Sequence, residues 1–212
     1  MKGDSGAFKR LFPQKHIPII LSSILDASKL LKKKTEYDRE DWITRRLHGR
    51  IIRLPAFRDG PAALSIQLQP EIPSMDLDSN TPGGRIDLLV PSDQGYQVYF
   101  AIEAKRLRFL SPGGQFKSGN DEYVKNGMMR FIKGRYAPLM ENGAMLGYVF
   151  DGYTDTARLG VDGYICEKAR ELKLKHPKGL VKSEILPDGS VDETRHSLTG
   201  RIFTIYHIFI DI

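Results

Sequence analysis

The sequence predicts one α/β domain, in which helices flank a central sheet, and three features lead to this prediction. Residues 84–90 and 96–105 are β-rich runs separated by the turn-forming residues 91–95, which is the pattern of a β-hairpin. Residues 144–150 and 202–212 are apolar runs typical of further strands. Stretches with helical periodicity and helix-end signals lie before and after the hairpin.

No internal repeat, low-complexity tract or linker interrupts residues 1–212, so one domain is the simplest organisation, with residues 1–15 expected to be loose. The chain is 41% hydrophobic and 27% charged, which is ordinary for a soluble globular protein with one well-filled core. Its formal net charge of +6 and its pI of about 9.3 favour polyanionic partners such as nucleic acid, although proteins that bind none share this balance.

Two observations bear on the compartment. Cys166 is the only cysteine, so no disulfide forms within the chain and a reducing compartment is expected, with the cytoplasm as the default. No apolar run approaches the roughly 18 residues of a membrane span. The run 17–25 has the apolarity of a signal-peptide core, but its charged leader is long and Asp26 and Lys29 follow it at once, so we expect a helix and no membrane.

Two helices are expected before the hairpin. The first has Pro18 in its opening turn and runs to about Lys34. The second has Thr35 as its N-cap and runs to about His48, with Gly49 just beyond its end.

After the hairpin, Asn120 is expected to cap a helix that runs to about Lys133 and ends at Gly134. The Gly-rich residues 111–119 before it lack the Gly-Lys-Ser/Thr order of a nucleotide-binding P-loop. The other expected elements are a strand at 64–68, a loop at 70–84, a helix at 154–175 with a candidate break near Gly160–Gly163, and a hairpin within 184–198.

The hairpin gathers charged residues at one end. If the turn pivots near Gly95, Asp87 and Glu103 lie opposite each other, with Cβ atoms about 4.5–5.5 Å apart. Glu103 and Lys105 are two residues apart and project from the same face. A divalent cation would turn the repulsion of the two carboxylates into attraction, and hard oxygen ligands suit Mg²⁺. The alternative is a solvated hairpin end with a Glu–Lys pair.

The second helix supplies a further carboxylate. Glu36 and Glu40 lie on the face that carries Ile43 and Leu47. A carboxylate directed towards a core costs free energy unless it is paired or bound to a metal. Either glutamate therefore qualifies as a site residue, and the alternative is that both lie at the rim and interact with the helix dipole.

The most basic neighbourhood of the chain follows the hairpin, with Tyr123 and Tyr136 interleaved. Basic side chains among aromatic ones are what a nucleic-acid backbone would contact, and the alternative is a solvated helix face over core aromatics. The candidate nucleic-acid-binding residues are Lys117, Lys125, Arg130, Lys133 and Arg135.

The order of these features, a helix with Glu40 (or Glu36), a strand with Asp87, a strand with Glu103-x-Lys105 and then a helix, resembles the PD-(D/E)XK or restriction-endonuclease-like nuclease superfamily. The resemblance covers residues 36 to about 150, and Ile86 stands where the motif name has proline. The tail at 194–197 and 205–209 resembles the C-terminus of bacterial nuclease-like proteins linked with phage defence.

The resemblance implies a restriction-endonuclease-like α/β/α fold with a central mixed sheet, and metal-dependent hydrolysis of phosphodiester bonds. Asp87, Glu103 and the Ala104 carbonyl would bind Mg²⁺ or Mn²⁺, with Glu40 completing the shell directly or through water. Lys105 would position the attacking water and offset charge on the phosphate. The basic helix would hold the nucleic-acid backbone without reading its sequence.

The expected substrate is nucleic acid, with DNA preferred over RNA, and antiviral defence is the expected context. A partner ATPase or helicase, another defence-system subunit, or a second copy of the chain would direct it to its target. Two other functions stay open: a non-catalytic subunit of the same fold that binds nucleic acid or a partner, and a phosphodiesterase that acts on a small nucleotide.

Overall fold

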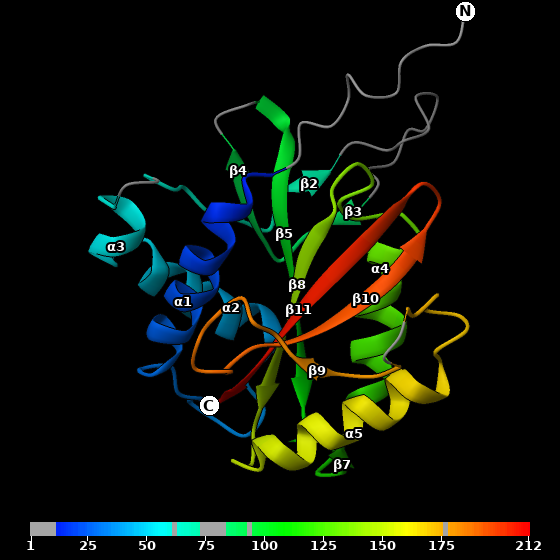
Figure 1. The fold of residues 1–212 in the computed structure, drawn as a ribbon. Helices are drawn as coiled ribbons and strands as arrows, with labels where there is room; N and C mark the ends of the chain where they lie inside the picture. The colour runs from blue at the N-terminus through cyan, green and yellow to red at the C-terminus, as the bar shows by residue number, and fades with distance from the viewer. Residues whose placement is uncertain (1–11, 61–62, 73–83, 93–94, 176–177) are drawn as a thin grey trace, which may run out of the picture.

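The computed structural model of the chain describes residues 12–60, 63–72, 84–92, 95–175 and 178–212. A seven-stranded mixed sheet lies at the centre, in the order β1-β4-β5-β8-β11-β10-β9. Helices lie on both sides of this sheet, α1 and α2 on one side and α4 and α5 on the other (Figure 1). The predicted α/β class, with a central mixed sheet flanked by helices, is therefore confirmed.

The strands of the central sheet are β1 (Gln67–Leu68), β4 (Leu88–Ser92), β5 (Gly95–Leu107), β8 (Asn142–Val149), β9 (Val181–Lys182), β10 (Asp192–Leu198) and β11 (Arg201–Asp211). Strands β5, β8 and β11 run parallel to one another, and the outer pairs are antiparallel. Two small sheets pair β2 (Glu71–Ile72) with β3 (Gly84–Arg85), and β6 (Phe109–Leu110) with β7 (Phe116–Lys117).

The helices are α1 (Ile17–Ser28), α2 (Glu40–Ile51), α3 (Pro55–Arg58), α4 (Met129–Ile132) and α5 (Thr154–Glu167), with the short helical turn η2 (Gln14–His16) before α1 and the π-helical segment η3 (Glu122–Met128) before α4. Among the described helices, none has the length and apolarity needed to cross a membrane.

The predicted hairpin is confirmed as β4 and β5, and its register agrees with the prediction. Leu88 pairs with Ile102, so the next position places Asp87, the residue before β4, against Glu103. Strand β8, in which every residue is buried, and the long terminal strand β11 are confirmed as well.

Both helices before the hairpin differ from the prediction. Helix α1 stops at Ser28, whose hydroxyl bonds the Leu25 carbonyl, and the chain then turns so that Leu31 enters the core. Helix α2 begins at Glu40, because Thr35 does not cap it: the hydroxyl of this residue donates to Asp38 in a separate turn.

The ends of α2 also follow tertiary contacts. Gly49, predicted to lie beyond the helix, is within it, because the helix continues until Ile51 is buried in the core.

Residues 70–84, predicted to be a loop, contain β2 and the first residue of β3, and residues 73–83 lie outside the described residues.

The helix after the hairpin ends as predicted but begins differently. The N–H of Gly134, at φ +69°, bonds the Phe131 carbonyl, and the N–H of Arg135 bonds the Arg130 carbonyl, which is the Schellman arrangement. Asn120 makes no capping bond, because its buried Oδ1 has no hydrogen-bond partner among the described residues, and its partly buried side chain packs against Gly160 of α5. A Cβ at Gly160 would lie 2.6 Å from the Asn120 amide nitrogen, so this glycine allows the close approach and does not break α5.

Two buried histidines join β10 and β11 through Thr194. The Leu172 carbonyl accepts from His196 Nδ1 (2.8 Å), so in the neutral ring Nε2 accepts from the Thr194 hydroxyl (2.8 Å). The Thr194 oxygen then accepts from His207 Nε2 (2.9 Å), and His207 Nδ1 accepts from the Tyr123 hydroxyl (2.9 Å). All four of these hydrogen bonds have a donor and an acceptor when both imidazole rings are neutral, in keeping with the prediction that these histidines are structural.

Burial lowers the pKa of His196 from 6.5 to about 4 and lowers that of His207 well below its ordinary value. Since the folded state resists protonation, this contribution to stability is complete above pH 6.5 and is lost as the pH falls towards 4, with a size of roughly 3 kcal/mol for His196. His196→Gln should therefore flatten the fall in the free energy of unfolding across this window. Urea unfolding at several pH values measures it, and parallel curves for wild type and variant would contradict the assignment.

Candidate active site

The predicted site residues meet where β4 has ended and β5 continues. Beyond Glu103, β5 keeps β8 on one side, with Lys105 paired to Gly147, but no strand of the described residues pairs with it on the β4 side. A pocket of about 340 Å³ opens there. Its lining residues are Glu40, Gly84, Arg85, Asp87, Glu103, Lys105, Arg130, Arg135 and Tyr136.

Two carboxylates take the place of the missing strand. The Ala104 N–H donates to Asp87 Oδ2 (2.8 Å), and the Arg106 N–H donates to Glu40 Oε2 (3.0 Å). Backbone donors at a partly buried strand edge need acceptors. The end of β5 therefore fixes the positions of both carboxylates through its own backbone.

The structure distinguishes between Glu36 and Glu40. Glu40, the first residue of α2, lines the pocket and also accepts from Lys105 Nζ (3.0 Å). Glu36 precedes the helix and pairs at the surface with Lys33 (3.0 Å). Since α2 begins five residues later than Thr35, only Glu40 reaches the site.

The Lys105 ammonium lies at the centre of the cluster. Its Nζ donates to Glu103 Oε1 (2.8 Å), the Ala104 carbonyl (2.7 Å) and Glu40 Oε1 (3.0 Å), which uses all three donors. Burial alone would lower the pKa of Lys105, but Glu103 and Glu40 outweigh burial and raise it above its ordinary value. The side chain therefore carries a positive charge.

Glu103 is the most buried member of the cluster, with 1% of its surface exposed. Its Oε1 accepts from Lys105 and from Arg130 (3.0 Å), whereas its buried Oε2 has no hydrogen-bond partner among the described residues. Burial, followed by the charge of Asp87, raises the pKa of Glu103 to about 8. An unpaired buried acceptor costs about 1–3 kcal/mol, so this oxygen favours the arrival of a cation or donor.

Sequence reasoning did not identify the role of Tyr136. Its hydroxyl donates to the Arg85 carbonyl (2.6 Å) and accepts from the Arg130 guanidinium, so it ties the strand before Asp87 to the end of the helix after the hairpin. Gly84 leaves room for this ring, because a Cβ there would lie 2.8 Å from Tyr136. The aromatic residue among basic ones was the available signal, but the sequence does not show which tyrosine faces the site.

The five candidate nucleic-acid-binding residues do not all lie together. Arg130 and Arg135 line the pocket. Lys125 lies over the Tyr164 ring of α5 (5.5 Å), Lys117 is exposed on β7 and Lys133 is exposed after α4.

The oxygen donors of the pocket are chemically suited to a hard cation, but they are not arranged as a preformed metal site. In the part of the chain that the structure describes, no group of three or more His, Cys, Asp or Glu side chains forms a preformed metal site. The free Oε2 of Glu103, the Asp87 carboxylate and the Ala104 carbonyl are oxygen donors of the kind that Mg²⁺ takes. Binding at the Ala104 carbonyl requires Lys105 Nζ to move away from that oxygen.

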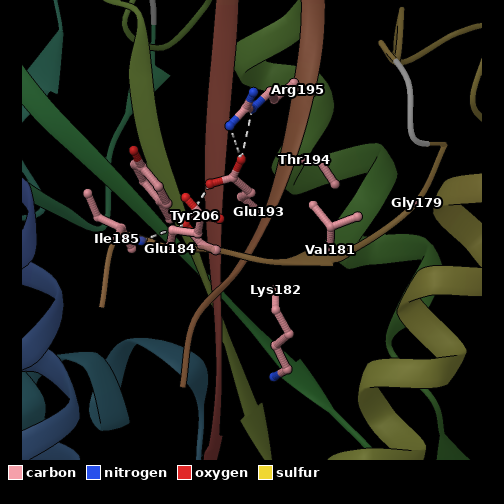
Figure 2. Close-up of a pocket in the computed structure, with 10 residues that line it drawn as sticks. Gly179, Val181, Lys182, Glu184, Ile185, Glu193, Thr194, Arg195 and Tyr206 are labelled. Carbon is pink, nitrogen blue, oxygen red and sulfur yellow. Dashed lines mark hydrogen bonds and ion pairs between the residues drawn. The ribbon is translucent and has the colours of Figure 1, made fainter. Parts of the chain in front are cut away.

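A larger pocket of about 540 Å³ lies between β9, β10 and β11 (Figure 2). Glu193 is its most buried acid, and its carboxylate is already bonded by Arg195 and by the Ser183 hydroxyl. None of the predicted site residues lines this pocket. The smaller pocket is therefore the better candidate for chemistry.

Comparison with known proteins does not assign the chain to a family. No family model, curated protein or solved structure matches the chain. The pocket itself is the basis for a functional assignment.

The contribution of the Tyr136 hydroxyl to stability can be measured directly. Tyr136→Phe removes a bond to a backbone carbonyl and one to a guanidinium, and is expected to lower the free energy of unfolding by roughly 1–3 kcal/mol. Tyr37→Phe, at an exposed tyrosine, is the matched control and should change stability by less than about 0.5 kcal/mol. Equal effects in urea denaturation would show that Tyr136 does not hold the pocket together.

Proposed function

We propose that the protein is a metal-dependent nuclease of the PD-(D/E)XK type that hydrolyses phosphodiester bonds of nucleic acid, with DNA as the expected substrate. One observation carries this proposal: Glu40, Asp87 and the Glu103-x-Lys105 pair, which are distant in sequence, line a single pocket. The order of these residues along the chain and their convergence agree with the resemblance of the sequence to this superfamily.

The proposed cofactor is Mg²⁺ or Mn²⁺, held by Asp87, Glu103 and the Ala104 carbonyl, with Glu40 bound directly or through water. Bound there, the ion would lower the pKa of a water molecule and withdraw charge from the phosphate. Asp87 and Glu40 are already oriented by the backbone of β5, so little side-chain reorganisation is required of them.

Lys105 has two roles in this proposal. Without the ion, its ammonium offsets the carboxylate charges. When a substrate enters, the same ammonium would position the attacking water and offset negative charge that develops on the phosphate. Arg130 and Arg135, on the wall of the pocket, would bind the neighbouring phosphates and provide affinity without sequence readout.

A non-catalytic binding subunit is the second candidate, and a specific observation favours it. Lys105 already satisfies oxygens of Glu40, Glu103 and Ala104, as a purely structural ion cluster would. Such a subunit would use the basic wall of the pocket to bind nucleic acid and would not need a metal.

Cleavage assays test the nuclease proposal. Linear, circular and single-stranded DNA, and RNA, are incubated with the protein and Mg²⁺, Mn²⁺ or EDTA. Lys105→Met and Glu40→Gln should each lower the metal-dependent rate by at least about 100-fold, because the first removes the ammonium at the reacting phosphate and the second removes a carboxylate of the proposed metal shell.

The matched control is Glu36→Gln, which changes the same residue type just outside the pocket and should keep full activity. Absence of metal-dependent cleavage on all four substrates, or full activity of Lys105→Met, would refute the proposal.

Metal titration separates the two candidate functions. Isothermal titration of the wild-type protein with Mn²⁺ should show a site that Asp87→Asn abolishes. Arg130→Gln should tighten Mn²⁺ binding, because it removes a competing cation from Glu103 Oε1. If the wild-type protein binds no Mn²⁺, the non-catalytic subunit is supported.

The setting of this activity belongs to the same proposal. We expect the protein to work in the cytoplasm, in keeping with its single cysteine, and in antiviral defence. Since the sequence predicts a single domain without a separate recognition domain, a partner ATPase or helicase, another defence subunit, or a homodimer would select the target.

A further inference from the structure

Two exposed aromatic rings flank a single arginine just beyond the catalytic end of β5. The guanidinium carbon of Arg108 lies 5.3 Å from the Phe116 ring centre and 5.5 Å from that of Tyr153. Phe116 is 54% and Tyr153 63% exposed. We call Arg108, Phe116, Tyr153 and Asp151 the Arg108 cluster.

The cluster is built by three separate segments of backbone. Arg108 has a left-handed backbone (φ +51°), uncommon for a residue with a side chain, and its N–H bonds the Ser118 carbonyl (3.0 Å). Gly119 allows β5 and the β6–β7 hairpin to come this close, because a Cβ there would lie 2.1 Å from the Arg106 carbonyl oxygen. Backbone held in a sparsely populated conformation often marks a functional site.

Asp151 fixes the arginine and one of the rings together. Its carboxylate accepts from Arg108 Nε (3.0 and 2.9 Å) and also from the Tyr153 N–H (3.2 Å). The charge of Arg108 is therefore balanced by Asp151, and its guanidinium packs against both rings. What the cluster presents to solvent is chiefly aromatic surface.

The position of the cluster connects it to the proposed active site. Arg108 is the residue after β5 and follows Lys105 by three residues, so their Cα atoms are at most about 11 Å apart, the reach of three extended residues. That distance is short enough for neighbouring nucleotides of one strand to reach both places. Lys117, exposed beside Phe116 on β7, adds positive charge for a phosphate.

We propose that the Arg108 cluster stacks unpaired bases, so that the substrate is single-stranded nucleic acid or the unpaired strand at a duplex end. This inference rests on the proposed nuclease function for its connection to the active site. A base in a duplex already stacks on its neighbours and does not offer its face to Phe116 or Tyr153. An unpaired base does, and stacking on an aromatic side chain tolerates any sequence.

Fluorescence anisotropy in EDTA, where no metal-dependent cleavage occurs, tests the proposal on the full chain. A labelled single-stranded oligonucleotide is compared at low salt with the same sequence as a blunt duplex. Phe116→Ala and Tyr153→Ala should each weaken single-strand binding by roughly 5- to 150-fold, the effect of losing one stacked base, and change duplex binding less than twofold.

Matched variants separate stacking from other causes. Leu159→Ala changes an equally exposed apolar residue on α5 (63%) and should leave binding unchanged. Tyr153→Phe keeps a ring and should bind as wild type, whereas Phe116→Leu keeps apolar surface without a ring and should lose affinity. Thermal melting confirms that each variant is folded.

The outcomes are distinguishable from those of the nuclease test. Equal loss on single strand and duplex, full affinity of Phe116→Leu, or no binding of single strands by the wild-type protein would overturn the proposal. Full affinity of Phe116→Leu would show that single-strand binding needs apolar surface at this position and not an aromatic ring. Ring-dependent binding without any cleavage would support the cluster and refute the nuclease.

Discussion

The ion cluster around Glu103 and Lys105 is the interaction on which the pocket depends. Glu103 has 1% of its surface exposed and a pKa raised to about 8, and the cations of Lys105 and Arg130 are what favour its ionised form against burial. Removing one partner of such a buried pair commonly costs about 3–5 kcal/mol, because the other charge is left uncompensated. The residues proposed for catalysis are therefore also residues that the metal-free fold needs.

This double role follows from how the sheet is built. Because β4 begins only at Leu88, opposite Ile102, the last part of β5 has no strand partner on that side among the described residues, and its N–H groups at Ala104 and Arg106 bond the carboxylates of Asp87 and Glu40. A complete β-ladder would have left no opening there. The edge thus provides both the space for a substrate and the backbone groups that orient the acids.

Much of this arrangement could be predicted from the sequence where local signals and burial agree. The hairpin, its register, strand β8 and the helix end at Gly134 were predicted correctly, because alternation, turn residues and a left-handed glycine act within a few residues. Helix ends were predicted poorly. Ser28 bonds the Leu25 carbonyl at the end of α1, before the predicted end of that helix, and Thr35, a residue type suited to an N-cap, bonds Asp38 in a turn that precedes α2.

The sequence by itself determined the α/β class, the hairpin and the set of acids and lysine that stand near its end. The tertiary structure alone decided that Glu40 and not Glu36 enters the pocket, that Tyr136 holds Arg130, and that the basic residues divide between the pocket and other surfaces. The physical reason is distance along the chain. Hydrogen bonds between residues dozens of positions apart, such as that from Lys105 to Glu40, depend on how the layers pack, and no local pattern records them.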